Sequence, residues 1–194
     1  MLVVLEGLDG AGKSTQVKKL RNYLESLYGS LEYIHFPRYD APVYGNLISR
    51  FLRGDFGDNQ TVHPQLVALL FAEDRHGAAP AMKDILNNGG TVLLDRYVYS
   101  NIAYQCAKIS DENEAQVLRD WIFNTEYGNF SLPVPATSSW MFPSLSWSRS
   151  SRVREEERTA IILKERRIYM RLISNFRSVS EASIARSVSS TRNS

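Results

Sequence analysis

The segment GLDGAGKST, residues 7–15, constrains the fold of this chain more than any other feature. It matches the pattern G-x-x-x-x-G-K-[ST], follows the apolar strand-like stretch MLVVLEG, and leads into a helical pattern of apolar residues over 16–27. Glycines at such a junction let successive backbone N–H groups converge on phosphate oxygens at the positive end of a helix. The segment therefore predicts a phosphate-binding loop in an α/β domain.

Two side chains of this loop are suited to contact the phosphates and their metal. Lys13 adds a point charge at the β- and γ-phosphates, and Ser14 offers a hydroxyl to Mg²⁺. We therefore expect ATP and Mg²⁺ as cofactors. The strand–loop–helix context disfavours the alternative, a glycine turn that binds nothing. The rest of the predicted nucleotide-binding loop consists of Gly7, Leu8, Asp9, Gly10, Ala11, Gly12 and Thr15.

Charged residues follow two further predicted strands. LEYIHF (31–36) is followed closely by Arg38, and the strand in GTVLLDR (90–96) ends in Asp95 and Arg96. Ligands of α/β sheets bind at the carboxyl ends of strands, so Arg38 suits an anion. Asp95 can hold Mg²⁺ through water, and Arg96 can neutralise a transferring phosphate. The alternatives are a solvated loop arginine for Arg38 and a helix N-cap for Asp95.

Two pairs of side chains at helical spacing predict a site for a planar base. Phe71 and Arg75 lie four residues apart in a helical pattern over 62–78, and Asn101 and Tyr104 lie three apart after the third strand. Such pairs share a helix face, where a ring can stack on a base and a guanidinium or amide can hydrogen-bond to it. The alternative is that Phe71 and Tyr104 are packed core aromatics.

Composition narrows the partners and the compartment. A net charge of +2 implies no polyanionic partner, and no apolar run approaches the roughly 20 residues of a membrane span. The single Cys106 cannot form an internal disulfide, which fits a reducing cytosol. We expect a cytoplasmic protein that binds neither nucleic acid nor membrane. His35, His63 and His76 show no ligand spacing, and we assign them no chemistry.

Four segments, in this order and spacing, resemble the thymidylate kinase (dTMP kinase) family of P-loop nucleoside-monophosphate kinases. They are GLDGAGKST, FPRY at 36–39, LFAEDRHGA at 70–78 and DRYVYSNIAY at 95–104, and the resemblance covers about the first 135 residues. It implies a five-stranded parallel sheet with helices on both faces, a homodimer, and transfer of the ATP γ-phosphoryl group to dTMP for dTTP synthesis. A deoxynucleoside kinase and an inactive product of a damaged kinase gene are the alternatives.

The resemblance also implies the roles of individual residues. Arg38 and Arg96 would clamp the dTMP phosphate with support from Tyr39, while Asp9 would meet the sugar 3′-hydroxyl or the metal shell. The catalytic residues would be Lys13, Asp9, Arg38 and Arg96, and the metal would lie at Ser14 and Asp95.

At the base, Phe71 would stack on thymine while Arg75 and Asn101 hydrogen-bond its edge. Tyr104 would crowd the position of a ribose 2′-hydroxyl and so favour deoxynucleotides. The full substrate-binding set would be Asp9, Phe36, Arg38, Tyr39, Phe71, Arg75, Arg96, Asn101 and Tyr104.

The composition changes from about Ala136 onward. All 11 glycines lie at or before Gly128, no aspartate follows Asp120, and the remainder is rich in serine and arginine. Because an α/β fold needs glycine where its turns require positive φ, we interpret 1–135 as the kinase core and 136–194 as an atypical tail. By the family resemblance, a neutral Gly10 in the loop implies that a lid arginine from the second half is needed. Arg149, Arg152, Arg154 and Arg158 lie where a lid would be, but a shifted frame would make their placement accidental, so we assign the role to none of them.

The segment SSWMFP, residues 138–143, suggests a cause. Its codons include TGG ATG TTY CCN, which read one base earlier as NTG GAT GTT YCC, encoding Leu, Met or Val, then Asp, Val, and Pro or Ser. The family has a fourth strand ending in Leu-Asp-Val-Pro at this place. We therefore hypothesise that a small insertion or deletion near Pro135 or Ala136 shifted the frame, leaving three clearly encoded strands. The alternative is a genuine Ser/Arg-rich tail that binds nucleic acid or stays disordered.

Overall fold

The computed structural model describes residues 1–7, 13–135 and 137–141, with side chains up to 135. The chain divides into two compact units, Met1–Ser148 and Arg149–Ser194, and the described residues all belong to the first. Most of the predicted loop, residues 8–12, and the tail from 142 onward lie outside the described residues.

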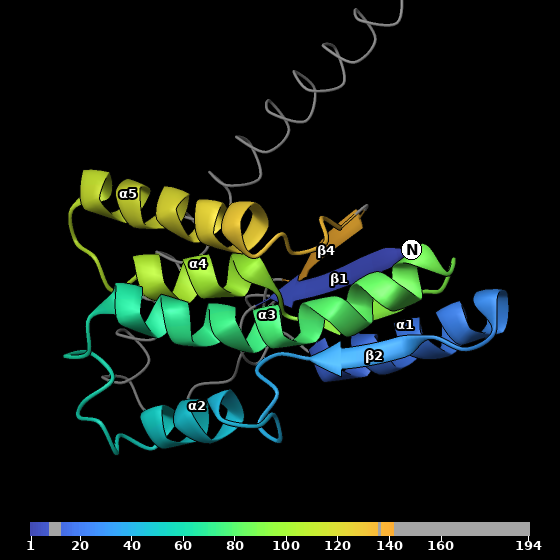
Figure 1. Ribbon diagram of the computed structural model, residues 1–194, viewed down its shortest axis with the longest axis horizontal. Helices are drawn as coiled ribbons and strands as arrows, with labels where there is room; N and C mark the ends of the chain where they lie inside the picture. Colours follow the sequence, from blue (N-terminus) through green and yellow to red (C-terminus); the bar gives the residue numbers. More distant parts are fainter. Residues whose placement is uncertain (8–12, 136, 142–194) are drawn as a thin grey trace, which may run out of the picture. The chain divides into compact units, whose positions relative to one another are not determined.

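A parallel sheet organises the first unit (Figure 1). Its strands are β1 (Leu2–Gly7), β2 (Glu32–His35), β3 (Val92–Asp95) and β4 (Thr137–Met141), in the order β2-β3-β1-β4. The central strand β3 is buried along its whole length, as expected of a parallel strand covered on both faces. In this register Asp95 lies beside Leu5 of β1 and His35 of β2, so three strand ends meet at one edge of the sheet.

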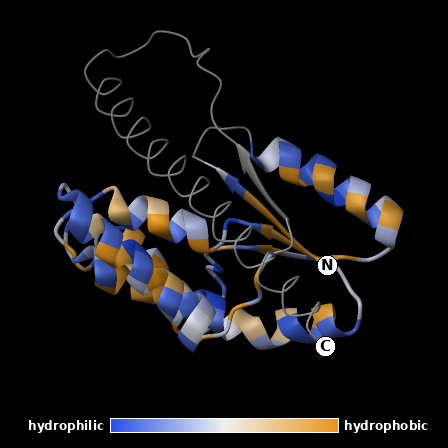
Figure 2. Cartoon of the chain, turned by 90° about the horizontal axis from the view of Figure 1, so that it is seen from above, coloured by the Kyte–Doolittle hydropathy of each residue, from blue (hydrophilic) through white to orange (hydrophobic). Residues whose placement is uncertain are grey.

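Five α-helices and a short π-helical turn accompany the sheet in the described residues. Helix α1 packs on one face of the sheet and α3 on the other (Figures 1 and 2), and Figure 2 also shows the hydrophobic residues gathered in the central strands. The helices are α1 (Lys13–Tyr28), α2 (Tyr44–Leu52), α3 (Pro64–Asn87), α4 (Val98–Cys106) and α5 (Glu112–Phe123), followed by the turn η1 (Asn124–Asn129).

Helix α4 is the most deeply buried helix near the strand ends, and a buried carboxylate fixes its start. Glu6, the last buried side chain of β1 before Gly7, accepts hydrogen bonds from the backbone N–H groups of Tyr97 at 3.0 Å and Ser100 at 3.3 Å. It also accepts one from the Ser100 hydroxyl. Glu6 thus satisfies backbone donors that the first turn of a helix leaves unpaired. The predicted alternative role of Asp95 as the cap does not apply, because Tyr97 is the N-cap of α4.

The strand β4 differs from our interpretation, which counted three clearly encoded strands. Thr137–Met141 pairs in parallel with β1, from Thr137 beside Val3 to Met141 beside Gly7. Strand pairing uses main-chain groups, and threonine and tryptophan are both favoured in strands. This segment can therefore occupy the position beside β1 even though its side chains differ from Leu-Asp-Val-Pro. The division of the chain at residues 135 and 136 stays a prediction.

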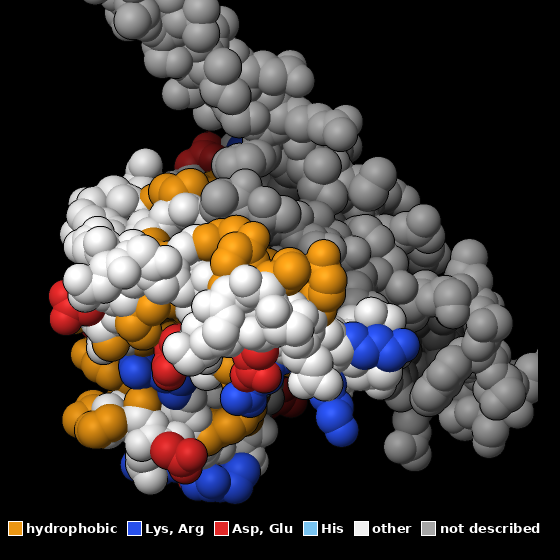
Figure 3. Space-filling model, turned by 90° about the vertical axis from the view of Figure 1, so that its right-hand side faces the viewer, with side chains coloured by type: hydrophobic (Ala, Val, Ile, Leu, Met, Phe, Trp, Pro, Cys, Tyr) orange, Lys and Arg blue, Asp and Glu red, His pale blue; other side chains and the backbone are white. Residues whose placement is uncertain are grey.

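The surface of the described part carries charges of both signs. On the face that Figure 3 shows, acidic and basic side chains lie next to one another with hydrophobic side chains between them. Among the described residues no helix is both long enough and apolar enough to cross a membrane.

Candidate functional site

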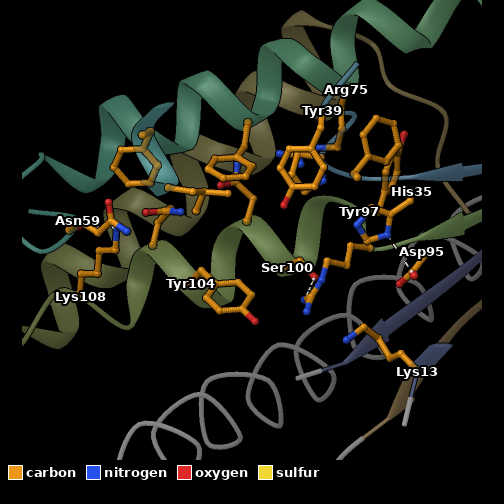
Figure 4. A pocket seen from close by; sticks show the side chains of 18 of the residues that line it. Lys13, His35, Tyr39, Asn59, Arg75, Asp95, Tyr97, Ser100, Tyr104 and Lys108 are labelled. Carbon is orange, nitrogen blue, oxygen red and sulfur yellow. Dashed lines mark hydrogen bonds and ion pairs between the residues drawn. The ribbon is translucent and has the colours of Figure 1, made fainter. Parts of the chain in front are cut away.

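A cleft of about 440 Å³ opens along the carboxyl edge of the sheet. Figure 4 shows it running from Lys13 and Asp95 at one end to Asn59 and Lys108 at the other. Its walls come from the start of α1, the segments after β2 and β3, and helices α2, α3 and α4. The cleft therefore joins elements far apart in sequence at the edge where parallel sheets bind ligands.

The first end of the cleft carries a buried acid among basic groups. Asp95 is only 6% exposed, accepts a hydrogen bond from His35 at 3.1 Å, and has one oxygen, Oδ1, with no partner among the described residues. Burial acts to raise the pKa of Asp95, but the His35 hydrogen bond and the charges of Lys13 and Arg96 hold it below its usual value. The carboxylate is thus ionised, with a free lone pair beside the cleft.

Arg96 lies next to this acid in an unusual backbone conformation. Its φ of 70° falls in the left-handed region, which costs free energy for a residue with a Cβ. The side chain donates from Nη1 to the Gly7 carbonyl at 3.0 Å and to the Ser100 hydroxyl at 3.2 Å, and the guanidinium lies over the Tyr104 ring. These contacts hold a positive charge at the mouth of the predicted phosphate-binding loop.

Arg38 lies outside the cleft lining and is bound to helix α3. Its Nε donates to Asp74 Oδ1 at 3.0 Å, its Nη2 to the Asp74 carbonyl at 2.6 Å, and its backbone N–H to Asp74 Oδ2 at 2.8 Å. The alternative of a freely solvated loop arginine therefore does not apply. The close approach also requires a small residue at Gly77, where a Cβ would stand 3.1 Å from Arg38 Nη2.

The middle of the cleft brings together the two pairs predicted from helical spacing. Phe71 and Arg75 line it from α3, and Asn101 and Tyr104 line it from α4. Phe71 is only partly buried and meets Phe51 edge-on, with ring centroids 6.5 Å apart, so it is not simply a core residue.

Four buried side-chain oxygens have no hydrogen-bond partner among the described residues, and all four belong to residues that line this cleft. They are Asn59 Oδ1, Asp95 Oδ1, Asn101 Oδ1 and Gln105 Oε1. A buried acceptor without a donor costs about 1–3 kcal/mol. Their concentration in one cleft indicates that it is shaped to receive a ligand with several donors or a cation.

The predicted site residues fall into three groups. Ten line the cleft: Lys13, Ser14, Phe36, Tyr39, Phe71, Arg75, Asp95, Arg96, Asn101 and Tyr104. Three described residues lie outside its lining: Gly7, Thr15 and Arg38. Five lie outside the described residues: Leu8, Asp9, Gly10, Ala11 and Gly12.

The sequence did not point to several residues that support or line the cleft. Glu6, Asp74 and Glu126 are fully buried acids that hold Ser100, Arg38 and Arg75, and no local pattern marks them. The sequence could have predicted that Gln105 and Lys108 line the cleft. Each lies four residues after a predicted site residue, Asn101 or Tyr104, and so shares its side of the helical segment. His35, to which we assigned no chemistry, bonds to Asp95.

No group of three histidine, cysteine or acidic side chains able to hold a metal occurs in the part of the chain that the structure describes. The described residues therefore do not form a metal site from protein side chains alone. Asp95 is the acidic side chain that lines the cleft.

Comparison with known proteins agrees with this geometry. A family model described as thymidylate kinase matches residues 5–126, which is more than half of the chain. The chain belongs to the thymidylate kinase family. It is 37% identical over 135 residues to the thymidylate kinase of Mycobacterium tuberculosis (strain H37Rv), and 37% identical over 107 residues to that of Homo sapiens.

The family match also extends to solved structures. The chain is similar to the thymidylate kinase of Candida albicans with a TM-score of 0.63 at 30% identity, covering 84% of this chain and 75% of that one. The thymidylate kinase from Ehrlichia chaffeensis has a TM-score of 0.58 at 21% identity, covering 88% and 81%, and shares the fold. The resemblance to this family and the expected α/β class with a parallel sheet are confirmed.

The match does not extend over the full length of the relatives. The alignment with the M. tuberculosis protein covers 70% of this chain but 62% of that protein, and the human alignment covers 55% and 48%. The aligned 135 residues are about as many as our proposed core contains.

Proposed function

We propose that this chain binds ATP and dTMP in the cleft and transfers the ATP γ-phosphoryl group to the dTMP phosphate, as a step of dTTP synthesis. One observation carries the proposal: a single cleft has Lys13 and Ser14 at one end and the pairs Phe71–Arg75 and Asn101–Tyr104 further along. The first two suit a donor triphosphate, and the pairs suit a planar base. We further propose a cytoplasmic location and, from the family, a homodimer.

The donor side would work through backbone groups and two side chains. The loop amides from Gly7 to Thr15 and the Lys13 ammonium would hold the phosphates. Asp9 would meet the sugar 3′-hydroxyl or the metal shell. The chemistry is an in-line transfer that needs positioning and charge neutralisation and forms no covalent intermediate with the protein.

The residues present fit a magnesium ion. Asp95 Oδ1 is a buried carboxylate oxygen without a described partner, and the Ser14 hydroxyl lines the same cleft. Mg²⁺ prefers oxygen ligands and binds through one or two protein groups together with waters and phosphates. We propose that Ser14 and Asp95 hold this ion, directly or through water, and that the ion when bound neutralises phosphate charge.

The acceptor phosphate would be held by the arginines near the strand ends. Arg96 is fixed at the cleft by Gly7 and Ser100, and Arg38 is fixed just outside it by Asp74. Phe36 and Tyr39 also line the cleft, and Tyr39 would support the phosphate site. Because both guanidiniums are held before any ligand arrives, little conformational entropy is lost when they bind an anion.

The base would be held by the two helical pairs. Phe71 would stack on thymine, while Arg75 and Asn101 would hydrogen-bond to its edge. Tyr104, which lies under the Arg96 guanidinium at 5.4 Å, would occupy the space that a ribose 2′-hydroxyl needs. This arrangement favours a deoxynucleoside monophosphate as the acceptor.

A coupled assay tests the proposal. ATP and Mg²⁺ are supplied with either dTMP or thymidine, and ADP formation is followed for the full chain, for Lys13→Ala, and for Lys18→Ala, an exposed control on α1. We expect slow turnover with dTMP, because no lid arginine is assigned in this chain, and none with thymidine. Lys13→Ala should lose about 10²-fold or more of that rate, and Lys18→Ala should change little. Preference for thymidine would favour a deoxynucleoside kinase. Binding of dTMP without turnover would identify an inactive product.

A further inference from the structure

Glu126 is a fully buried acid at the back of the cleft. It lies in the π-helical turn η1 after α5 and is 0% exposed. Its Oε2 accepts from Arg75 Nε at 2.5 Å, and its Oε1 accepts from Arg75 Nη2 at 2.7 Å and from Asn101 Nδ2 at 3.0 Å. One carboxylate therefore orients two of the side chains that line the base-binding part of the cleft.

The contacts of Asn101 determine which way its amide faces. Nδ2 donates to Glu126 Oε1 and to the Ala68 carbonyl at 2.9 Å, so both amide hydrogens are used. Oδ1 is buried and has no partner among the described residues. The reverse orientation would set Oδ1 against two acceptor oxygens, which is electrostatically unfavourable. Asn101 therefore presents an acceptor, rather than a donor, to a ligand.

The same carboxylate holds Arg75 as a donor. Burial works against the charge of Arg75, but Glu126 outweighs that effect and raises the pKa of the guanidinium above its usual value. Glu126 takes N–H groups on one side of the guanidinium. Arg75 has five N–H groups and lines the cleft, so others remain for a ligand acceptor.

We propose that Glu126 is a positioning residue that sets the hydrogen-bond polarity of the cleft, so that the cleft selects pyrimidines with an N–H beside a carbonyl and rejects the cytosine type. The inference rests on the proposed function, because it concerns the base of the acceptor. Thymine and uracil offer a donor at N3 and an acceptor at O4, which match Asn101 Oδ1 and Arg75. Cytosine offers an acceptor at N3, which would face the acceptor Asn101 Oδ1, and a donor at N4, which would face the donor Arg75. Neither pair can form a hydrogen bond.

The negative charge of Glu126 is essential to this arrangement. A glutamine at position 126 has a carbonyl oxygen that accepts and an amide group that donates. If the oxygen accepts from Arg75, the amide group faces Asn101. The Ala68 carbonyl is then the one remaining acceptor that opposes a turned amide, so Asn101 can more readily turn its Oδ1 toward residue 126 and present amide hydrogens to the cleft. A cytosine N3 would find a donor in that orientation. The substitution Glu126→Gln is thus expected to change selectivity in addition to affinity.

Calorimetric binding of dTMP, dUMP and dCMP to the full chain tests the proposal. Wild type should bind dTMP about 100-fold more tightly than dCMP or better, and dUMP should follow dTMP because it shares the N3–H. In Glu126→Gln the dTMP-to-dCMP affinity ratio should fall about tenfold or more. The control Glu114→Gln changes an exposed carboxylate on α5 and should leave the ratio unchanged.

The outcomes separate this inference from the proposed function. If wild type binds dTMP and Glu126→Gln weakens dTMP and dCMP equally, the selectivity role is overturned while the proposed acceptor stands. If wild type does not bind dTMP, both are overturned. Removing one partner of a buried ion pair can destabilise a fold by about 3–5 kcal/mol. If Glu126→Gln unfolds, Glu126→Asp takes its place: it keeps the charge but is too short to hold both Arg75 and Asn101, so the dTMP-to-dCMP affinity ratio should still fall, and an unchanged ratio would overturn the proposal.

Discussion

Asp74 and Arg38 are joined by three hydrogen bonds that fix the arginine before any phosphate is bound. The Asp74 carboxylate accepts from the backbone N–H and from Nε of Arg38, and the Asp74 carbonyl accepts from Nη2. Asp74 is 0% exposed, so these charge-assisted bonds are shielded from water. The loop after β2 is thereby attached to α3, and the guanidinium needs little reorganisation to meet an anion.

Replacing this acid should weaken phosphate binding specifically. Asp74→Asn puts an N–H group against one of the Arg38 donors, and we expect dTMP affinity to fall about tenfold. Thymidine, which lacks the phosphate, should bind wild type and variant alike, and titration calorimetry with both ligands measures this. Glu73→Gln changes the neighbouring acid, which contacts His76 rather than Arg38, and serves as the control. An equal loss for dTMP and thymidine would contradict a role for Asp74 in phosphate binding.

Glu6 should make stability depend on pH. Burial raises the pKa of Glu6 above its ordinary value of 4.5, although hydrogen bonds from Ser100 act in the opposite direction. The folded state thus holds this proton more tightly than the unfolded state does. The contribution of Glu6 to stability is therefore full below about pH 4.5 and is lost as the pH rises through the folded pKa.

The variant Glu6→Gln cannot titrate and isolates this effect. We expect the free energy of unfolding of wild type, relative to that of Glu6→Gln, to be larger at pH 5 than at pH 7, so that wild type is relatively more stable at the lower pH. Within the titration window the change is at most about 1.4 kcal/mol per pH unit. Urea unfolding followed by circular dichroism measures it. A difference that stays constant between pH 5 and pH 7 would show that the Glu6 pKa is the same in both states.

Cys106 should be unreactive in the folded protein. The thiol is 2% exposed, its Sγ donates to the Ala115 carbonyl at 3.4 Å, and burial raises its pKa to about 12. The thiolate is the reactive form, so a disulfide reagent at pH 8 should modify the native chain slowly and the urea-unfolded chain at once. Rapid stoichiometric modification without denaturant would contradict the packing of α4 against α5.

The two helical pairs that line the cleft could be predicted because local geometry alone places their members on one face. Residues three or four apart share a face of any α-helix, so Phe71–Arg75 and Asn101–Tyr104 needed only the correct helices. The strand that ends at Gly7 and the helix that begins at Lys13 were likewise predicted from local sequence, whereas the binding role of the loop between them stays a prediction. The start of helix α5 also follows from local sequence, because an aspartate is a preferred N-cap residue. Asp111 caps this helix and accepts hydrogen bonds from the N–H groups of Asn113 and Glu114.

The supporting acids could not be predicted because their partners are distant in sequence. Glu126 is 51 residues from Arg75, and Asp74 is 36 residues from Arg38. Each is buried next to its partner only after α3, α4 and η1 have packed together. Nothing within the local segment NTEYGN distinguishes Glu126 from a surface glutamate. Pairings of this kind depend on the tertiary arrangement, which periodicity does not encode.

The frame hypothesis makes a prediction at the strand β4. Inserting one base between the codons of Pro135 and Thr137 would make the codons of Trp140 and Met141 read NTG GAT GTT, so that Asp-Val would end this strand. We expect the resulting protein to phosphorylate dTMP at about 1–100 per second, a typical rate for kinases, and the chain as it stands to be at least about 100-fold slower. Resequencing the gene across these codons is the companion observation.

The two chains differ only after Pro135, so they share the cleft and make a matched pair. Both should bind dTMP, because the base-site residues Phe71, Arg75 and Asn101 precede the altered segment. Only the restored chain should regain the distal strands and the lid arginine that a neutral Gly10 makes necessary in this family. A closed lid excludes water from the phosphates, so its loss should slow phosphoryl transfer. Equal turnover by both chains, or an intact original reading frame in the gene, would contradict the frame hypothesis. Either result would leave the Ser/Arg-rich segment as a genuine part of this kinase.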